Sequence, residues 1–271
     1  MRQIRNLATA LAILCASLSF ACKETAATPR PSGTNYIVFL DLSLSLSDVQ
    51  QQSMDGVIRR FCDNVPPRSR LTVFPLGGYV EKAGSLVERT FPDDKFAVDR
   101  SALSAMRKTL PSTLQTAARA FARDIKNPKF ARHTCVSDAI RQAEQVIRDR
   151  PSDERTEILF VSDMLEDCPN SLLGGALSLE KTDIRNELAR VRAIPSMASW
   201  PDLRGASVTC VVPVSGPTPT KTKQPELEAL REFWAEVFSR CRHDEAAFRL
   251  GTSLPSRLLE PGRAGAGPAS P

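Results

Sequence analysis

The chain has 271 residues, of which 42% are hydrophobic and 25% are charged, and its net charge is +5. This length suffices for one domain with a substantial core. The mild charge is scattered along the sequence without interleaved aromatic residues, which argues against a nucleic-acid partner.

The N-terminus resembles an export signal. Two arginines precede an uncharged apolar run at residues 7–21, which is shorter than the about 20 residues of a membrane-spanning helix. The run ends in Ala21-Cys22, which predicts either a bacterial lipoprotein with a lipid on Cys22 or an ordinary secretory signal cut near Ala21. In both cases we expect residues 1–21 to be removed, and the net charge to fall to +3 with the loss of the two arginines. The mature protein is expected in the periplasm or cell envelope, anchored to the membrane if Cys22 is lipidated.

Both ends of the mature chain predict little structure. Residues 22–34 contain no large apolar residue and are expected to be a flexible tether. Residues 251–271 are expected to be a disordered tail, since Gly, Ala, Pro and Ser dominate from Pro261 onward. The folded domain is therefore predicted over residues 35–250.

Within this body, apolar β-branched runs alternate with segments whose apolar residues recur at helical spacing. The predicted strands are Tyr36–Leu42, Arg70–Pro75, Thr156–Ser162 and Ala206–Val214, with Ser85–Phe91 as an edge strand. The predicted helices are Ser47–Asn64, 99–126 with a break at Pro111, Ser137–Arg148, 179–193 and Glu226–Cys241. This alternation predicts an α/β fold, with a doubly wound, mostly parallel sheet and helices on both faces.

Polar residues gather where the predicted strands end. Asp41, Ser43 and Ser45 follow the first strand, Thr134 precedes a helix, and Asp163 follows the strand 156–162. Because the carboxyl ends of parallel strands share one edge of a sheet, these side chains are expected to converge there. Carboxylate and hydroxyl oxygens suit a hard divalent cation such as Mg²⁺.

The pattern resembles the metal-ion-dependent adhesion site of von Willebrand factor type A (VWA) domains. That site combines Asp-x-Ser-x-Ser after the first strand, a Thr before a later helix and an Asp after the fourth strand. The resemblance covers residues 35–241 and implies that the five residues hold Mg²⁺, Mn²⁺ or Ca²⁺ while a partner protein offers an Asp or Glu to the ion. It implies a non-catalytic, cation-dependent binding domain for adhesion or scaffolding. Leu44 and Met164 depart from the family pattern, which often has Gly at these positions, and residues 76–130 look like an insert.

Two other functions stay open. A metal-dependent envelope hydrolase on the same sheet edge would need a general base, for which the sequence offers His133 or Glu166. A phosphatase of the haloacid dehalogenase type is disfavoured, because Ser43 stands where its second Asp belongs. The third possibility is a structural domain with a vestigial site, in which the hydroxyl residues only cap helices.

Five cysteines follow Cys22, and an exported chain can join them in disulfides. In the layout of the VWA family the first and last helices are neighbours, which implies a Cys62–Cys241 pair. Cys135 and Cys168 both fall in loops at the metal edge, which implies a second pair that joins those loops. Cys210 lies within a predicted strand and is expected to be a buried free thiol. Alternatively, all five are small core residues.

Overall fold

The structure is a computed structural model, and it describes only part of the chain. The described residues are 33–42, 48–77, 84–124, 133–149, 155–171, 175–179, 183–194, 200–213, 224–243 and 247–259. Cys22, residues 1–32 and the tail from residue 260 lie outside them, so the predicted signal, lipid anchor and tether remain predictions. Within the described part, no helix is long and apolar enough to span a membrane.

Six strands form one sheet in the order β3-β2-β1-β4-β7-β8. Neighbouring strands are parallel, except that the edge strand β3 runs antiparallel to β2. The strand bounds are β1 Thr34–Asp41, β2 Arg70–Leu76, β3 Val87–Thr90, β4 Arg155–Val161, β7 Ala206–Val211 and β8 Phe248–Gly251. The predicted mostly parallel sheet and the edge strand predicted at Ser85–Phe91 are confirmed, and the antiparallel direction of β3 is an additional finding.

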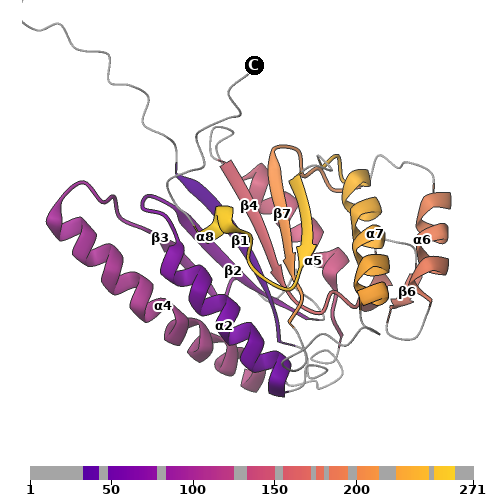
Figure 1. Ribbon diagram of the computed structural model, residues 1–271, viewed down its shortest axis with the longest axis horizontal. Coiled ribbons are helices and arrows are strands. Elements are labelled where there is room, and N and C mark those ends of the chain that lie inside the picture. The colour runs from indigo at the N-terminus through magenta and orange to yellow at the C-terminus, as the bar shows by residue number, and fades with distance from the viewer. Residues whose placement is uncertain are drawn as a thin grey trace, which may run out of the picture. The chain divides into compact units, whose positions relative to one another are not determined.

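Helices cover both faces of this sheet, so the fold is doubly wound (Figure 1). Helices α2, α4 and α8 contribute to one hydrophobic core and helices α5, α6 and α7 to another. The helix bounds are α2 Asp48–Asn64, α4 Ala97–Asp124, α5 Val136–Arg148, α6 Ile184–Ala193, α7 Gln224–Arg240 and α8 Ser256–Leu259. We call the two clusters the α2-side core, which includes Val38, Leu40, Phe61, Leu110 and Leu258, and the α7-side core, which includes Ile37, Phe39, Ile140, Phe160 and Phe238.

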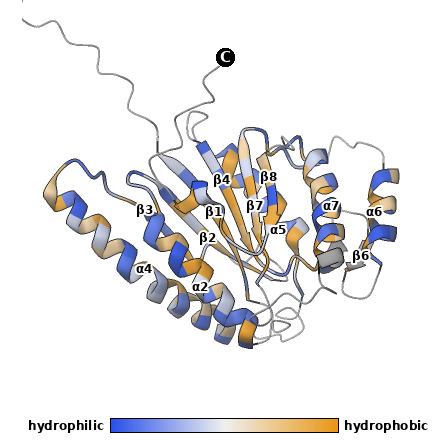
Figure 2. Ribbon diagram, in the orientation of Figure 1, coloured by the Kyte–Doolittle hydropathy of each residue, from blue (hydrophilic) through white to orange (hydrophobic). Residues whose placement is uncertain are grey.

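The central strand β1 supplies both cores. Ile37 and Phe39 belong to the α7-side core, whereas Val38 and Leu40 belong to the α2-side core. Successive side chains of a strand point to opposite faces, so a parallel strand covered on both faces has a nearly continuous apolar sequence. Figure 2 shows this hydrophobic stretch along the central strands.

Helix α4 occupies much of the predicted insert at 76–130. A break at Pro111 was predicted, but the helix continues through this residue. The hydroxyl of Thr109 donates to the carbonyls of Ala105 and Met106, within the turn that precedes the proline. Leu110 and Leu114, on either side of Pro111, are both buried in the α2-side core. Packing of both halves against one core therefore outweighs the local cost of proline in a helix, which is about 3 kcal/mol.

The folded region is longer than predicted at both ends. Helix α8 lies beyond residue 250, where the predicted domain ends, and Leu254 and Leu258 are buried in the α2-side core. At the start, Gly33 packs so closely that a Cβ there would overlap the carbonyl oxygen of Arg68. The predicted boundaries at residues 35 and 250 are therefore too narrow, and the predicted 179–193 helix begins only at Ile184.

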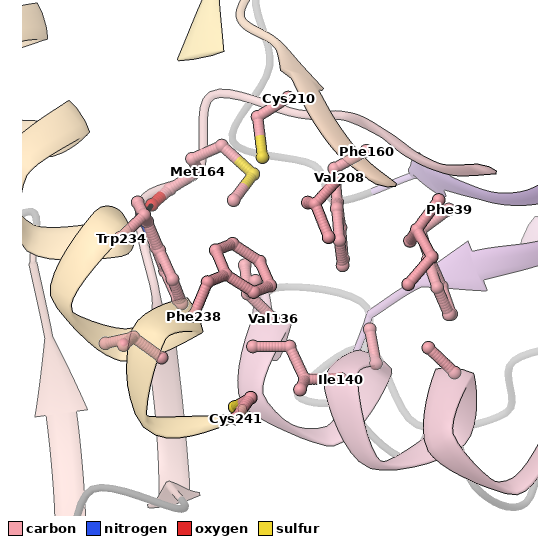
Figure 3. Close-up of a cluster of buried hydrophobic side chains, with 14 of the residues drawn as sticks. Phe39, Val136, Ile140, Phe160, Met164, Val208, Cys210, Trp234, Phe238 and Cys241 are labelled. Atoms are coloured by element: carbon pink, nitrogen blue, oxygen red, sulfur yellow. Dashed lines mark hydrogen bonds between the residues drawn. The ribbon is translucent and has the colours of Figure 1, made fainter. Parts of the chain in front are cut away.

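The predicted Cys62–Cys241 disulfide is wrong, because both cysteines are free and buried. Cys62 lies on α2 in the α2-side core, and Cys241 follows α7 in the α7-side core. Figure 3 shows Cys241 together with Ile140 and Phe238 in the latter cluster. The sheet separates the two thiols, since the first and last long helices cover opposite faces. Cys210 is a buried free thiol, as predicted.

Candidate metal centre at the carboxyl edge of the sheet

Asp41 ends the central strand and is almost completely buried, with 1% of its surface exposed. Its Oδ2 accepts a hydrogen bond from Ser162 Oγ at 2.7 Å, and Thr134 Oγ1 lies 3.5 Å from the same oxygen as a donor. These partners come from positions 121 and 93 residues away. The fold thus brings together Asp41 and Thr134, two of the predicted ligands.

The sheet topology explains this convergence. The chain leaves β1 toward β2 on one side and later returns to β4 on the other side of β1. Strand order therefore reverses between β1 and β4, which is the position where open α/β sheets bind ligands. The parallel register pairs Leu40 with Val161, so Asp41 and Ser162 follow at adjacent strand ends.

Asp163, the predicted ligand after β4, is half-buried, and its Oδ1 accepts a hydrogen bond from the Leu165 amide at 3.0 Å. Between them, Met164 has a φ of 61°, a left-handed conformation that is unfavourable for a residue other than Gly. Its amide donates to Ser162 Oγ at 2.9 Å, and its carbonyl accepts from Trp234 Nε1 at 3.0 Å. These bonds hold Met164 in its left-handed conformation.

Ser43 and Ser45, the remaining predicted ligands, lie outside the described residues. Their contribution to the site stays a prediction.

The loop before α5 and the loop after β4 are joined by several bonds. The predicted Cys135–Cys168 disulfide is present, with a Cα–Cα distance of 5.0 Å. The Asp167 amide donates to the carbonyl of Thr134 at 2.9 Å, and Asp167 Oδ2 lies 3.1 Å from His133 Nδ1. Thr134 is therefore held on both sides by neighbours that are bonded to the β4 loop.

Glu166, a candidate general base in the sequence, instead binds the N-terminus of α5. Its Oε2 accepts from the amides of Val136 and Ser137 at 2.6 and 3.1 Å, and its Oε1 accepts from Ser137 Oγ at 2.5 Å. The side chain is fully buried, and this burial raises the pKa of Glu166 from 4.5 to about 7 although these hydrogen bonds favour the charged form. A carboxyl group engaged in this way is not directed at a substrate.

The donor set fits a hard divalent cation. The Asp41 carboxylate lies beside the buried Thr134 hydroxyl, and a hydroxyl that donates its hydrogen to a carboxylate keeps lone pairs for an ion. A second group, formed by Cys135, Asp138 and Cys168, has ligand atoms within 4.8 Å of one another. In this structure its two sulfur atoms share the disulfide, so this group offers no dithiolate to a metal.

Sequence reasoning missed Ser162 and the capping role of Glu166 at this edge. Ser162 directly precedes Asp163, and the parallel register that places it beside Asp41 could have identified it. Glu166 caps a helix that begins 30 residues earlier in the chain, and the sequence carries no signal for this contact.

No family model matches the chain, and no curated protein matches it. Among solved structures, the SpRpn10 VWA domain has 11% identity over 84% of this chain and 94% of its own, with a TM-score of 0.37. A von Willebrand factor type A protein from Catenulispora acidiphila has 11% identity over 84% of this chain, which spans 40% of that protein, with a TM-score of 0.39. A manganese-loaded TRAP protein from Plasmodium vivax has 11% identity over 69% and 59%, with a TM-score of 0.33. Likenesses at this level do not establish family membership, and the fold class rests on the strand order and the two helical layers.

Proposed function

We propose that the chain is a VWA-like binding domain of the bacterial cell envelope that recognises another protein through a divalent cation. The supporting observation is the approach of Thr134 Oγ1 to 3.5 Å from Asp41 Oδ2 at the reversal of strand order. Two predicted ligands that are far apart in sequence meet there, both buried, in the order and strand context of the VWA motif.

In this proposal Asp41, Thr134 and Asp163 hold the ion together with Ser43 and Ser45. A bound Mg²⁺ or Mn²⁺ supplies an electrophilic centre, because neutral hydroxyls compensate little of its charge. Ser162 orients the Asp41 carboxylate through its 2.7 Å hydrogen bond. An Asp or Glu of the partner protein is the expected remaining ligand, so the domain binds and does no chemistry.

The hydrolase alternative loses one of its two candidate bases. The Glu166 carboxylate is engaged with α5, whereas His133 is partly exposed and paired with Asp167. His133 therefore carries that alternative, which predicts a hydrolytic activity that His133→Ala loses.

Titration calorimetry with Mn²⁺ and Mg²⁺ on the mature protein, purified in detergent, tests the metal site. We expect saturable heat from the wild type and none from Asp41→Asn, which keeps the shape of the side chain but removes its charge. Asp63→Asn, on an exposed position of α2, is the matched control and should bind like the wild type. A wild type without heat or thermal shift would leave the vestigial-site alternative.

The partner and the location require separate experiments. A pull-down from envelope extract should retain a protein in Mn²⁺ and release it with a chelator, and Asp41→Asn should retain none. For the anchor, radiolabelled palmitate should label the wild type and fail to label Cys22→Ala. Unlabelled wild-type protein would favour the ordinary secretory signal.

A further inference from the structure

Helix α5 begins at Val136, two residues after Thr134, and its own N-cap residue does not satisfy the first turn. Cys135 occupies the N-cap position and makes no side-chain capping bond. The first four amides of a helix have no partner within the helix, and leaving them unpaired in a buried place is costly. Val136 and Ser137, whose amides open α5, are both buried.

Glu166 supplies the missing cap from a different loop. Its two carboxyl oxygens accept from both of these amides and from the Ser137 hydroxyl, at distances of 2.5–3.1 Å. A carboxylate at this end of a helix also interacts favourably with the helix dipole. The direction in which the chain enters α5 is therefore set by a residue that follows β4.

The same loop holds the other side of this junction. The amide of Asp167, next to Glu166, donates to the Thr134 carbonyl at 2.9 Å, and the disulfide joins Cys135 to Cys168. Glu166 differs from these contacts because it fixes the first two residues of α5 directly. A small rotation of that first turn would displace Thr134 Oγ1, which is already 3.5 Å from Asp41.

We propose that Glu166 is a positioning residue for the cation site, which holds the Thr134 hydroxyl beside Asp41 by capping α5. This role rests on the proposed function, since Thr134 is a ligand only if the site binds a cation. Glu166 itself does not contact the ion. Its effect on binding passes through the N-terminus of α5 and the backbone of Thr134.

The test compares Mn²⁺ affinity with stability in three variants of Glu166. Glu166→Ala removes the cap and should weaken Mn²⁺ binding at least about tenfold. Glu166→Asp is one methylene shorter and should weaken it severalfold. Glu166→Gln keeps a side chain of the same length with an oxygen for the amides, so it should restore an affinity within about threefold of the wild type.

A purely structural role predicts a different result. Ile140→Ala, a cavity variant on the same helix and in the α7-side core, is the matched control. It should lower the melting temperature without changing the Mn²⁺ dissociation constant of the folded protein. If Glu166→Ala and Glu166→Asp also lose stability but keep wild-type affinity, the positioning role is refuted. Should Glu166→Ala fail to fold, equal affinities for the Asp, Gln and wild-type forms would refute it as well.

Failure of the proposed function can be distinguished from failure of the positioning role alone. If the wild type itself takes up no Mn²⁺ in calorimetry, the metal site and the positioning role fall together. If the wild type binds and only the dependence on residue 166 is missing, the metal site stands and the positioning role falls alone.

Discussion

Replacing Ser162 with alanine should destabilise the protein by about 3 kcal/mol. Ser162 is fully buried and makes two side-chain hydrogen bonds, one to the Asp41 carboxylate at 2.7 Å and one from the Met164 amide at 2.9 Å. A bond to a charged group contributes about 1.5–3 kcal/mol, and a neutral one about 0.5–1.5 kcal/mol. The loss is enhanced because Met164 keeps its left-handed backbone only with local support.

The chain provides a matched control for this substitution. Ser69 is also fully buried, but its Oγ has no hydrogen-bond partner among the described residues. Ser69→Ala removes the same atom without breaking a bond, and we expect a change within about 0.5 kcal/mol.

Denaturant unfolding followed by circular dichroism measures both variants, with a chelator present so that the result does not depend on a cation. For a domain of this size a loss of about 3 kcal/mol corresponds to a fall in melting temperature of roughly 6–12 °C. If Ser162→Ala is as stable as Ser69→Ala, the hydrogen bonds at this edge do not contribute as argued. The role assigned to Ser162 in orienting Asp41 would then be withdrawn.

Three further predictions concern other parts of the fold. Burial raises the pKa of Glu166 from 4.5 to about 7, so protonation of this carboxyl group stabilises the folded state. This stabilisation is full below pH 4.5 and is lost as the pH rises through 7. Glu166→Gln should therefore remove about 3 kcal/mol of pH dependence from unfolding curves measured across this window, and an unchanged slope would contradict the assignment. Replacing Cys135 and Cys168 together with serine opens a loop with a sequence separation of 33 and should cost roughly 3–4 kcal/mol, whereas a reductant should not further destabilise that variant. Gly33→Ala should lower the melting temperature, because its Cβ would overlap the Arg68 carbonyl; a melting temperature equal to that of the wild type would show that this backbone approach is not close.

The sequence was sufficient for the parts of the fold that are governed by local patterns. Strands β1, β4 and β7 are continuous apolar runs, and α5 has a clear apolar face, so their positions and the parallel sheet could be predicted. The small second sheet was not predicted. Its strands, β5 (Asp167–Ser171) and β6 (Gly175–Ser178), are short and contain Pro, Asn and Gly, which disfavour strands.

The predictions from sequence were wrong where a disulfide or a helix depends on which face of the sheet an element covers. The pairing of Cys62 with Cys241 required α2 and α7 to be neighbours, and nothing in either helix sequence identifies its face. Helix continuity at Pro111 likewise depends on the α2-side core rather than on local propensity. At the candidate site, Asp41 and Thr134 were identified from their types and positions, whereas the cap made by Glu166 exists only through tertiary contact.

The bond from Trp234 to the Met164 carbonyl gives the protein an intrinsic optical reporter. The chain has two tryptophans, and Trp234 is the one whose indole nitrogen is bonded next to Asp163. Its ring is fully buried between α7 and the sheet, so its emission depends on the local packing and on that single bond (Figure 3). In a Trp200→Phe background, a change in the emission of Trp234 on addition of Mn²⁺ would report a structural change beside Asp163 without any added label.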